Sequence, residues 1–196
     1  MYGRGREPSI VDNAAMATQY SEISDRLRGV LEEQAMFFVA TAAADGRVNV
    51  SPKGLDSLRV LSPNRVVWLN GTGSGNESAA HVLSNPRMTL MFCSFVREPL
   101  ILRLYGAARA VHEGDPDWNR LLDLFPPMLG ARTIFDVDID LVQTSCGYGV
   151  PLYELEGQRD LMPRWAEKKG EEGLRAYHRE RNASSIDGLP TGLPGT

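Results

Sequence analysis

The sequence feature that most constrains the fold is a succession of six or more short β-strand patterns between residues 36 and 145. Residues 36–41 and 48–53 flank an Asp45-Gly46 pair, which is a strong signal for a β-hairpin. Helical patterns do not alternate regularly with the strands, so a doubly wound parallel sheet is the weaker choice. The chain therefore predicts a mainly β (α+β) fold, an antiparallel β-barrel with peripheral helices. Further strands are expected at residues 57–61, 65–69, 87–95, 100–112 and 136–145.

The helical patterns lie mostly outside this run of strands and suggest how the chain is divided. Gly106, inside the strand expected at 100–112, predicts a β-bulge. Helices are expected at residues 21–34, 78–85, 116–125 with Asp115 as N-cap, 160–169 and 171–181. The expected divisions are a flexible N-terminal arm (1–18), the barrel domain (19–155), C-terminal helices packing on the barrel (156–182) and a tail (183–196).

Composition excludes several classes of function. The net charge of −4 and the lack of a basic tract argue against nucleic-acid binding. The longest apolar run is too short to span a bilayer and the N-terminus has no signal-peptide pattern, so no membrane association and a cytoplasmic location are expected. Two distant cysteines and three scattered histidines show no metal-ligand spacing, so no metal is expected.

A glycine-rich turn, residues 71–77, separates an apolar strand from a short helix. Ser74 and Glu77 have the spacing of a capping box, which predicts a helix that starts close to Ser74. A helix start offers free backbone N–H groups, and glycines let an anion approach them, so the turn is a candidate phosphate cradle. The alternative is that the glycines serve only the backbone of an ordinary turn. Neither a dinucleotide fingerprint nor a P-loop is present.

Other polar and aromatic residues have two possible interpretations. Ser51 and Lys53 share one side of an expected edge strand, distorted by Pro52, and face either solvent or a polar pocket near the glycine turn. Trp68 is expected in the core or beside an aromatic ligand. Arg103, in an apolar strand, requires a partner, and an internal acid such as Asp138 or Asp140 is favoured slightly over an anionic ligand.

Cys146 and Tyr148 follow the last expected strand. They either present a thiol and a phenol to a ligand or belong to a glycine-rich exit from the strand in which the cysteine is buried. No Cys/His pair, Ser/His/Asp set or pair of catalytic carboxylates accompanies them. The chain thus offers features of cofactor binding without an acid–base constellation, a combination that fits chemistry carried by the cofactor.

Taken together in order, these segments resemble the pyridoxamine 5′-phosphate oxidase-like family, the FMN-binding split β-barrels. The resemblance covers about residues 21–151. It rests on the segments Phe37-Phe38-Val39-Ala40-Thr41, Asp45-Gly46, Val48-Asn49-Val50-Ser51-Pro52-Lys53, Trp68-Leu69, Gly73-Ser74-Gly75-Asn76, Asn85-Pro86-Arg87-Met88-Thr89-Leu90-Met91-Phe92 and Leu102-Arg103-Leu104-Tyr105-Gly106-Ala107-Ala108.

The resemblance implies a split barrel that forms a homodimer with two FMN sites at the subunit interface. The strands 50–53 and 67–70 would flank the isoalloxazine ring, the turn 72–77 would hold the phosphate, and the segment 146–151 of the partner would lie near the ring. The implied function is an FMN-dependent oxidoreductase acting on a small molecule. The cofactor-binding residues expected are Val50, Ser51, Pro52, Lys53, Arg59, Trp68, Leu69, Asn70, Thr72, Gly73, Ser74, Gly75, Asn76, Cys146 and Tyr148.

The chain departs from the family at the phosphate turn, where it has Ser74-Gly75-Asn76 and many members carry Ser-Arg-Lys. Lys53, Arg59 or Arg103 are the candidates to replace the missing charge. The Arg-x-His substrate motif of the true oxidase is also missing. The alternatives are a flavin-binding protein without turnover, or the same barrel with deazaflavin F420 or haem, the latter ligated by His81, His112 or Cys146.

Overall fold

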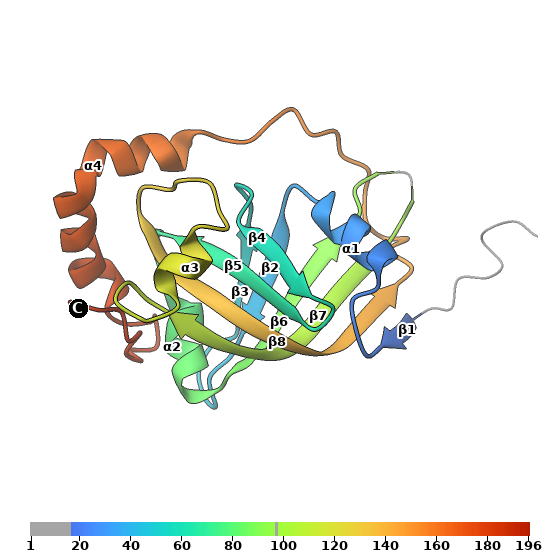
Figure 1. The fold of residues 1–196 in the computed structure, drawn as a ribbon, viewed down its shortest axis with the longest axis horizontal. Coiled ribbons are helices and arrows are strands. Elements are labelled where there is room, and N and C mark those ends of the chain that lie inside the picture. Colours follow the sequence, from blue (N-terminus) through green and yellow to red (C-terminus); the bar gives the residue numbers. More distant parts are fainter. Residues whose placement is uncertain (1–16, 97) are drawn as a thin grey trace, which may run out of the picture.

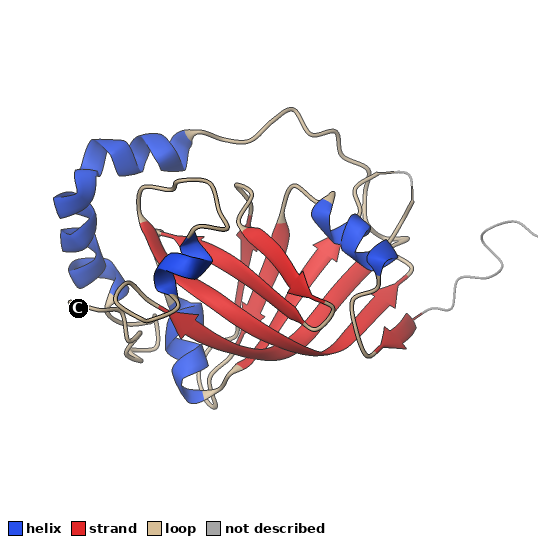
Figure 2. Ribbon diagram, in the orientation of Figure 1, coloured by secondary structure: helices blue, strands red, loops and turns tan. Residues whose placement is uncertain are grey.

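The computed structural model describes residues 17–96 and 98–196. In this part of the chain eight strands form one sheet in the order β3-β2-β6-β7-β8-β5-β4, with β1 paired to β8, and every pairing is antiparallel. The sheet curves without closing, and helices lie around it (Figures 1 and 2). The predicted antiparallel split barrel with peripheral helices is confirmed. The strands are β1 (Ala17–Tyr20), β2 (Phe37–Thr41), β3 (Asn49–Lys53), β4 (Leu58–Ser62), β5 (Arg65–Gly71), β6 (Arg87–Cys93), β7 (Ile101–Val111) and β8 (Ala131–Ser145).

Two differences from the strands predicted from the sequence exceed two residues. β8 begins at Ala131, five residues before the expected start at 136, because Ala131 to Phe135 pair with the end of β5. Residues 17 and 18 belong to β1 rather than to a flexible arm, since they pair with Ser145 and Thr144. Residues 1–16 of the expected arm lie outside the described residues.

The helices are α1 (Asp25–Glu32), α2 (Glu77–Ser84), α3 (Trp118–Leu122) and α4 (Leu161–Tyr177), which continues into a π-helical turn, η2 (His178–Asn182). Gly170 (φ +65°) interrupts α4 between the two expected C-terminal helices. The expected N-cap of α3 is wrong: Asp117 occupies that position. The Asp115 carboxylate instead accepts a hydrogen bond from the backbone N–H of His112. No helix in the described ranges has the length and apolar character needed to cross a bilayer.

β5 is buried on both faces and separates two apolar cores. Val66 and Trp68 belong to the main core inside the barrel, where the Trp68 ring stacks on Phe135 at 4.4 Å. Val67 and Leu69 point the other way, into a smaller core beneath α3. Because both faces of β5 are packed, the strand is held in place, and so is the start of the glycine turn that follows it.

The β-bulge predicted at Gly106 is confirmed. The pairing of β7 with β8 shifts register between Tyr105 and Gly106. A Cβ atom at Gly106 would overlap the carbonyl oxygen of Asp138, so only glycine fits there. The bulge lets the long β7 bend with the barrel.

Candidate functional site

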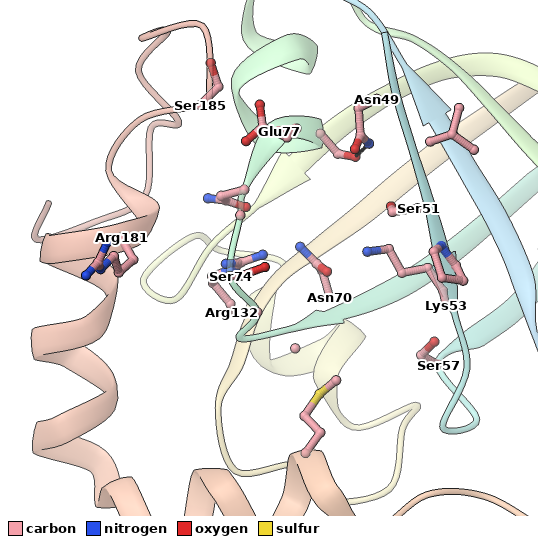
Figure 3. A pocket seen from close by; sticks show the side chains of 18 of the residues that line it. Asn49, Ser51, Lys53, Ser57, Asn70, Ser74, Glu77, Arg132, Arg181 and Ser185 are labelled. Carbon is pink, nitrogen blue, oxygen red and sulfur yellow. Dashed lines mark hydrogen bonds between the residues drawn. The ribbon is translucent and has the colours of Figure 1, made fainter. Parts of the chain in front are cut away.

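A cavity of about 920 Å³ lies where the edge strand β3 faces the end of β5 (Figure 3). The glycine turn, the first residues of β8 and the C-terminal segment complete its wall. The lining residues that carry polar or charged side chains are Arg47, Asn49, Ser51, Lys53, Ser57, Asn70, Ser74, Asn76, Glu77, Ser78, Arg132, Glu180, Arg181, Ser184 and Ser185.

β3 is the edge strand that its sequence pattern predicted. It lies at one edge of the sheet, paired only with β2 among the described strands. Pro52, which has no N–H to donate, lies within it. All four of Val48, Val50, Ser51 and Lys53 line the cavity, but Val48 and Val50 are 70% and 61% exposed, whereas Ser51 and Lys53 are partly buried. Of the two interpretations of this strand, the polar pocket near the glycine turn is therefore the one that holds.

Lys53 places an ammonium group between the core and the cavity. Its Nζ lies 5.3 Å from the centroid of the Trp68 ring, and Figure 3 shows it pointing toward Asn70 on β5. Burial, and then the positive charge of Arg132, lowers the pKa of Lys53 from 10.5 to about 8. The surroundings of Lys53 in the cavity thus favour its charged form less than water does.

The glycine turn between β5 and α2 is held in place by Thr72. Its hydroxyl donates to the carbonyl of Gly130 at 2.8 Å and also contacts Nε2 of His178 at 2.7 Å. Thr72 therefore anchors the turn instead of lining the cavity. Residues 73–76 do line it, and a Cβ added at Gly73 would meet open space.

The capping box predicted for this turn is wrong. The N-cap of α2 is Asn76, and no side chain caps the helix. The two carboxylate oxygens of Glu77 accept from the backbone N–H of Ile186 at 3.0 and 3.1 Å, so Glu77 is turned toward the C-terminal segment. This leaves Ser74, which lines the cavity, free of a capping role.

Arg132, at the start of β8, is the charged site residue that the sequence reasoning missed. Its side chain is only 3% exposed, and its Nη1 donates a 2.6 Å hydrogen bond to Oδ1 of Asn182. Its Nε has no partner among the described residues, and neither has the buried Oδ1 of Asn76. Burial lowers the pKa of Arg132 to about 10, which still leaves it charged at neutral pH.

A signal for Arg132 was present in the sequence. Like Arg103, it is an arginine next to an apolar run, here Ile134-Phe135. The expected strand began too late, at 136, so Arg132 fell in a loop where a charge needs no explanation.

The C-terminal segment lines one side of the cavity and is anchored there by Asn182, which is fully buried. Asn182 donates from Nδ2 to the carbonyl of Gly73 at 3.1 Å, and its own carbonyl accepts from Thr191 Oγ1 at 2.6 Å and from Asn76 Nδ2 at 3.4 Å. In Figure 3, Ser74, Arg132 and Arg181 lie on this side of the cavity, and Lys53 lies on the β3 side. Asn182 thus joins the glycine turn to the C-terminus.

Three residues that the sequence suggested for the site are held elsewhere. Arg59 pairs with Asp56, donates to the carbonyl of Leu124 and lies over the Phe125 ring at 5.0 Å, so it does not line the cavity. Trp68 is fully buried in the core. The ion pair suggested for Arg103 is wrong: it donates to Ser145 Oγ at 3.1 Å.

The register explains why Arg103 has no acidic partner within the part of the chain that the structure describes. Arg103 lies opposite Gln143 on β8, whereas Asp138 lies opposite Ala107. The Arg103 guanidinium is therefore kept away from the acids that the sequence suggested.

Cys146 and Tyr148 follow the C-terminal end of β8, whereas Arg132 lies at its N-terminal end. Neither Cys146 nor Tyr148 lines the cavity within one chain.

Of the haem ligands considered, His81 is buried against Thr41, with Nδ1 at 3.1 Å from its hydroxyl. Nδ1 of His112 lies 3.4 Å from the Thr133 hydroxyl. No histidine or cysteine lines the cavity, and the described residues contain no cluster suited to a metal ion.

A sequence model of the family described as pyridoxamine 5′-phosphate oxidase matches residues 23–146, more than half of the chain. The chain belongs to this family. A curated relative, the pyridoxamine 5′-phosphate oxidase family protein ustO of Aspergillus flavus, is 38% identical over 191 residues, which cover 87% of this chain and 76% of that protein.

A solved structure agrees with this fold. A putative pyridoxamine 5′-phosphate oxidase from Lactobacillus delbrueckii superposes with a TM-score of 0.52 at 22% identity, covering 63% of this chain and 94% of that one. HutZ, the heme storage protein from Vibrio cholerae, has a TM-score of 0.45 at 16% identity, covering 61% and 93% of the two chains. The latter similarity is too distant to bear on the cofactor.

The family match divides the cavity wall into two parts. β3, the glycine turn and Arg132 lie inside residues 23–146, whereas Asn182 and the C-terminal lining residues lie after them, namely Glu180, Arg181, Ser184, Ser185 and Ile186. The C-terminal wall of the cavity therefore lies outside the part of the chain that the family model matches.

Proposed function

We propose that this chain binds FMN in the cavity between β3 and the glycine turn, and that it is an FMN-dependent oxidoreductase acting on a small molecule. The observation that carries the proposal is the buried guanidinium of Arg132, which lines this cavity and whose Nε has no hydrogen-bond partner in residues 17–96 and 98–196. A buried cation with unmade hydrogen bonds is costly unless an anion accompanies it.

The residues around Arg132 suit a phosphate group. Ser74 offers a hydroxyl, and the turn 73–76 offers backbone close to the N-terminus of α2, which favours anions. Charge-assisted hydrogen bonds of this kind contribute about 1.5–3 kcal/mol each. Glu77, the acid that would repel a phosphate, is engaged with the N–H of Ile186. Arg132 thereby takes the place of the Arg-Lys pair that the turn lacks.

The rest of the cavity suits the flavin ring and a substrate. Its volume of about 920 Å³ lies at the upper end of the range for ligand sites, about 300–1,000 Å³. Leu69, Met128 and Met162 supply apolar surface, and Ser51 and Lys53 supply polar groups on the opposite wall. When bound, FMN supplies the redox chemistry, accepting and returning electrons. The protein's own groups bind and orient it, and Lys53 holds a proton beside it.

Self-association is part of the proposal. The segment 147–160 joins β8 to α4 and arches away from the barrel in Figure 1. It exposes Leu152, Tyr153 and Leu155, each by at least 66% of its surface. Apolar side chains in such a number favour burial against another surface. A second copy would cover them and bring its Cys146–Pro151 segment near the ring, as the family resemblance implies.

The visible absorbance spectrum of the purified protein, before and after addition of FMN and removal of the excess, tests the proposal. The expected result is a two-band flavin spectrum that stays with the protein and bleaches when NADH or NADPH is added without oxygen. Retained FMN that neither nucleotide reduces would favour a flavin-binding protein without turnover. A Soret band, or no retained flavin, would contradict the proposal.

A further inference from the structure

The loop of residues 183–190 closes on itself and spans one end of the cavity; we call it the C-terminal clasp. Ser184 bridges to Pro190, and the Ser185 N–H donates to the carbonyl of Leu189 at 2.8 Å. Thr191 donates back to the carbonyl of Ala183 at 3.1 Å. These contacts make the clasp a folded unit with its tip at residues 186–187.

The tip of the clasp joins the two walls of the cavity. On one side, the backbone N–H of Ile186 donates to Glu77 at the start of α2. On the other side, Asp187 accepts from the backbone N–H and the guanidinium of Arg47, which precedes β3. Gly46 leaves room for this pairing, because a Cβ there would lie 2.6 Å from Oδ2 of Asp187. The clasp therefore holds β3 and the glycine turn together across the cavity.

The base of the clasp lies next to the proposed phosphate site. Asn182 holds the guanidinium of Arg132 and the carbonyl of Gly73, and the next residues in the wall are Ser184, Ser185 and Ile186. A phosphate on Arg132 would thus face the clasp on the side away from the flavin ring. A terminal phosphate fits this end of the cavity, whereas a phosphate that carries a further substituent would place that substituent against the clasp.

We propose that the C-terminal clasp makes the phosphate end of the cavity blind, and so restricts the cofactor to a flavin that ends in a phosphate monoester. This inference rests on the proposed function and deepens it. FMN satisfies the restriction. FAD, whose phosphate continues into an adenylate, does not, nor does deazaflavin F420, whose phosphate is a diester. Specificity then arises from a clash with the wrong cofactor as well as from contacts with the right one.

The test compares the affinities of riboflavin, FMN and FAD for the full chain by quenching of flavin fluorescence. The wild-type protein is expected to bind FMN roughly 100-fold or more tightly than FAD, because the adenylate cannot be placed. The double variant Asp187→Ala/Glu77→Ala detaches both sides of the tip and is expected to lower this FMN-over-FAD ratio roughly tenfold, through tighter FAD binding. Asp160→Ala, which removes an exposed pair with Arg164, is the matched control with an unchanged ratio.

The outcomes separate the two proposals. Equal binding of FMN and FAD by the wild-type protein would overturn the clasp while leaving the flavin site in place, as would an unchanged ratio in the double variant. Binding of none of the three flavins would overturn both. Circular dichroism and retained FMN affinity show whether the double variant is folded. If it is not, the single variant Asp187→Ala decides, because it removes only the contacts with Arg47, and its ratio must fall for the clasp to stand.

Discussion

The guanidinium of Arg132 and the side-chain amide of Asn182 are hydrogen-bonded at 2.6 Å, although fifty residues separate them in the chain. Both residues are buried. Arg132 is the second residue of β8, the longest strand of the barrel, and Asn182 ends the C-terminal helical segment. Their contact makes the C-terminal segment part of the cavity, and the other hydrogen bonds of Asn182 extend this link to the glycine turn.

Asn182→Ala is expected to destabilise the protein by about 2–3 kcal/mol, because it leaves buried groups of Arg132 and Gly73 without partners. Urea denaturation measures this loss. Asn119→Ala, at an exposed position of α3, is the control and is expected to change the free energy of unfolding by less than about 0.5 kcal/mol. Equal effects of the two substitutions would contradict the anchoring role of Asn182.

FMN affinity is expected to fall at alkaline pH because of Lys53. Burial and the charge of Arg132 lower its pKa to about 8, so the free protein loses this ammonium above that pH. A bound phosphate or flavin anion favours the ammonium form, and the affinity should decrease as pH rises through 8, by at most about tenfold per pH unit. Titrations between pH 7 and 9.5 measure this. Lys53→Met should remove the decrease, and a variant profile parallel to that of the wild type would argue against the role of Lys53.

His178 is expected to make the protein sensitive to acid. Burial, and then the charge of Arg132, lowers its pKa from 6.5 to about 4. The unfolded chain therefore binds more protons between these values, and stability falls as pH drops through this window, by about 1–2 kcal/mol at pH 5 for this residue. Urea denaturation at pH 7.5 and 5.0 should show a smaller acid loss in His178→Gln than in the wild type. The same loss in both would assign the acid sensitivity to other groups.

Asp136→Asn is expected to destabilise the barrel by about 2–4 kcal/mol, since the buried carboxylate binds Arg65 through two hydrogen bonds and Arg109 through a third. Asp117→Asn alters a more exposed acid that shares Arg109 and should cost much less. Thermal unfolding of the two variants provides the comparison. If Asp117→Asn proved the more damaging, the buried cluster would not be what stabilises this face of β8.

Most of the barrel was predictable from the sequence because its strands have local signals. Alternation in residues 87–93 placed Met88, Leu90 and Phe92 on one face, and all three are buried in the main core. The Asp45-Gly46 hairpin and the bulge at Gly106 are also local features. β1 escaped prediction because its four residues are stabilised by pairing with β8, a contact that its own sequence does not encode.

The β3 side of the cavity was predictable in the same way, since alternation alone separates Ser51 and Lys53 from Val50. On the opposite side the glycine turn was also predictable, but Arg132 and the C-terminal wall were not, because they depend on contacts between distant segments. Nothing local shows that Glu77 binds Ile186, 109 residues later, instead of capping its own helix. Nor does any local pattern show that the arginine in the cavity is Arg132 and not Arg59 or Arg103.

The most direct test of the central claim is the ratio of FMN to riboflavin affinity in the wild type and in Arg132→Met, with Arg59→Met as control. The two flavins differ only in the phosphate, so the ratio isolates the phosphate site from any general loss of the cavity. The wild-type protein and Arg59→Met should favour FMN by roughly 100-fold, and Arg132→Met should reduce that preference about tenfold or more while riboflavin affinity stays within about twofold. An unchanged ratio in folded Arg132→Met would contradict the account.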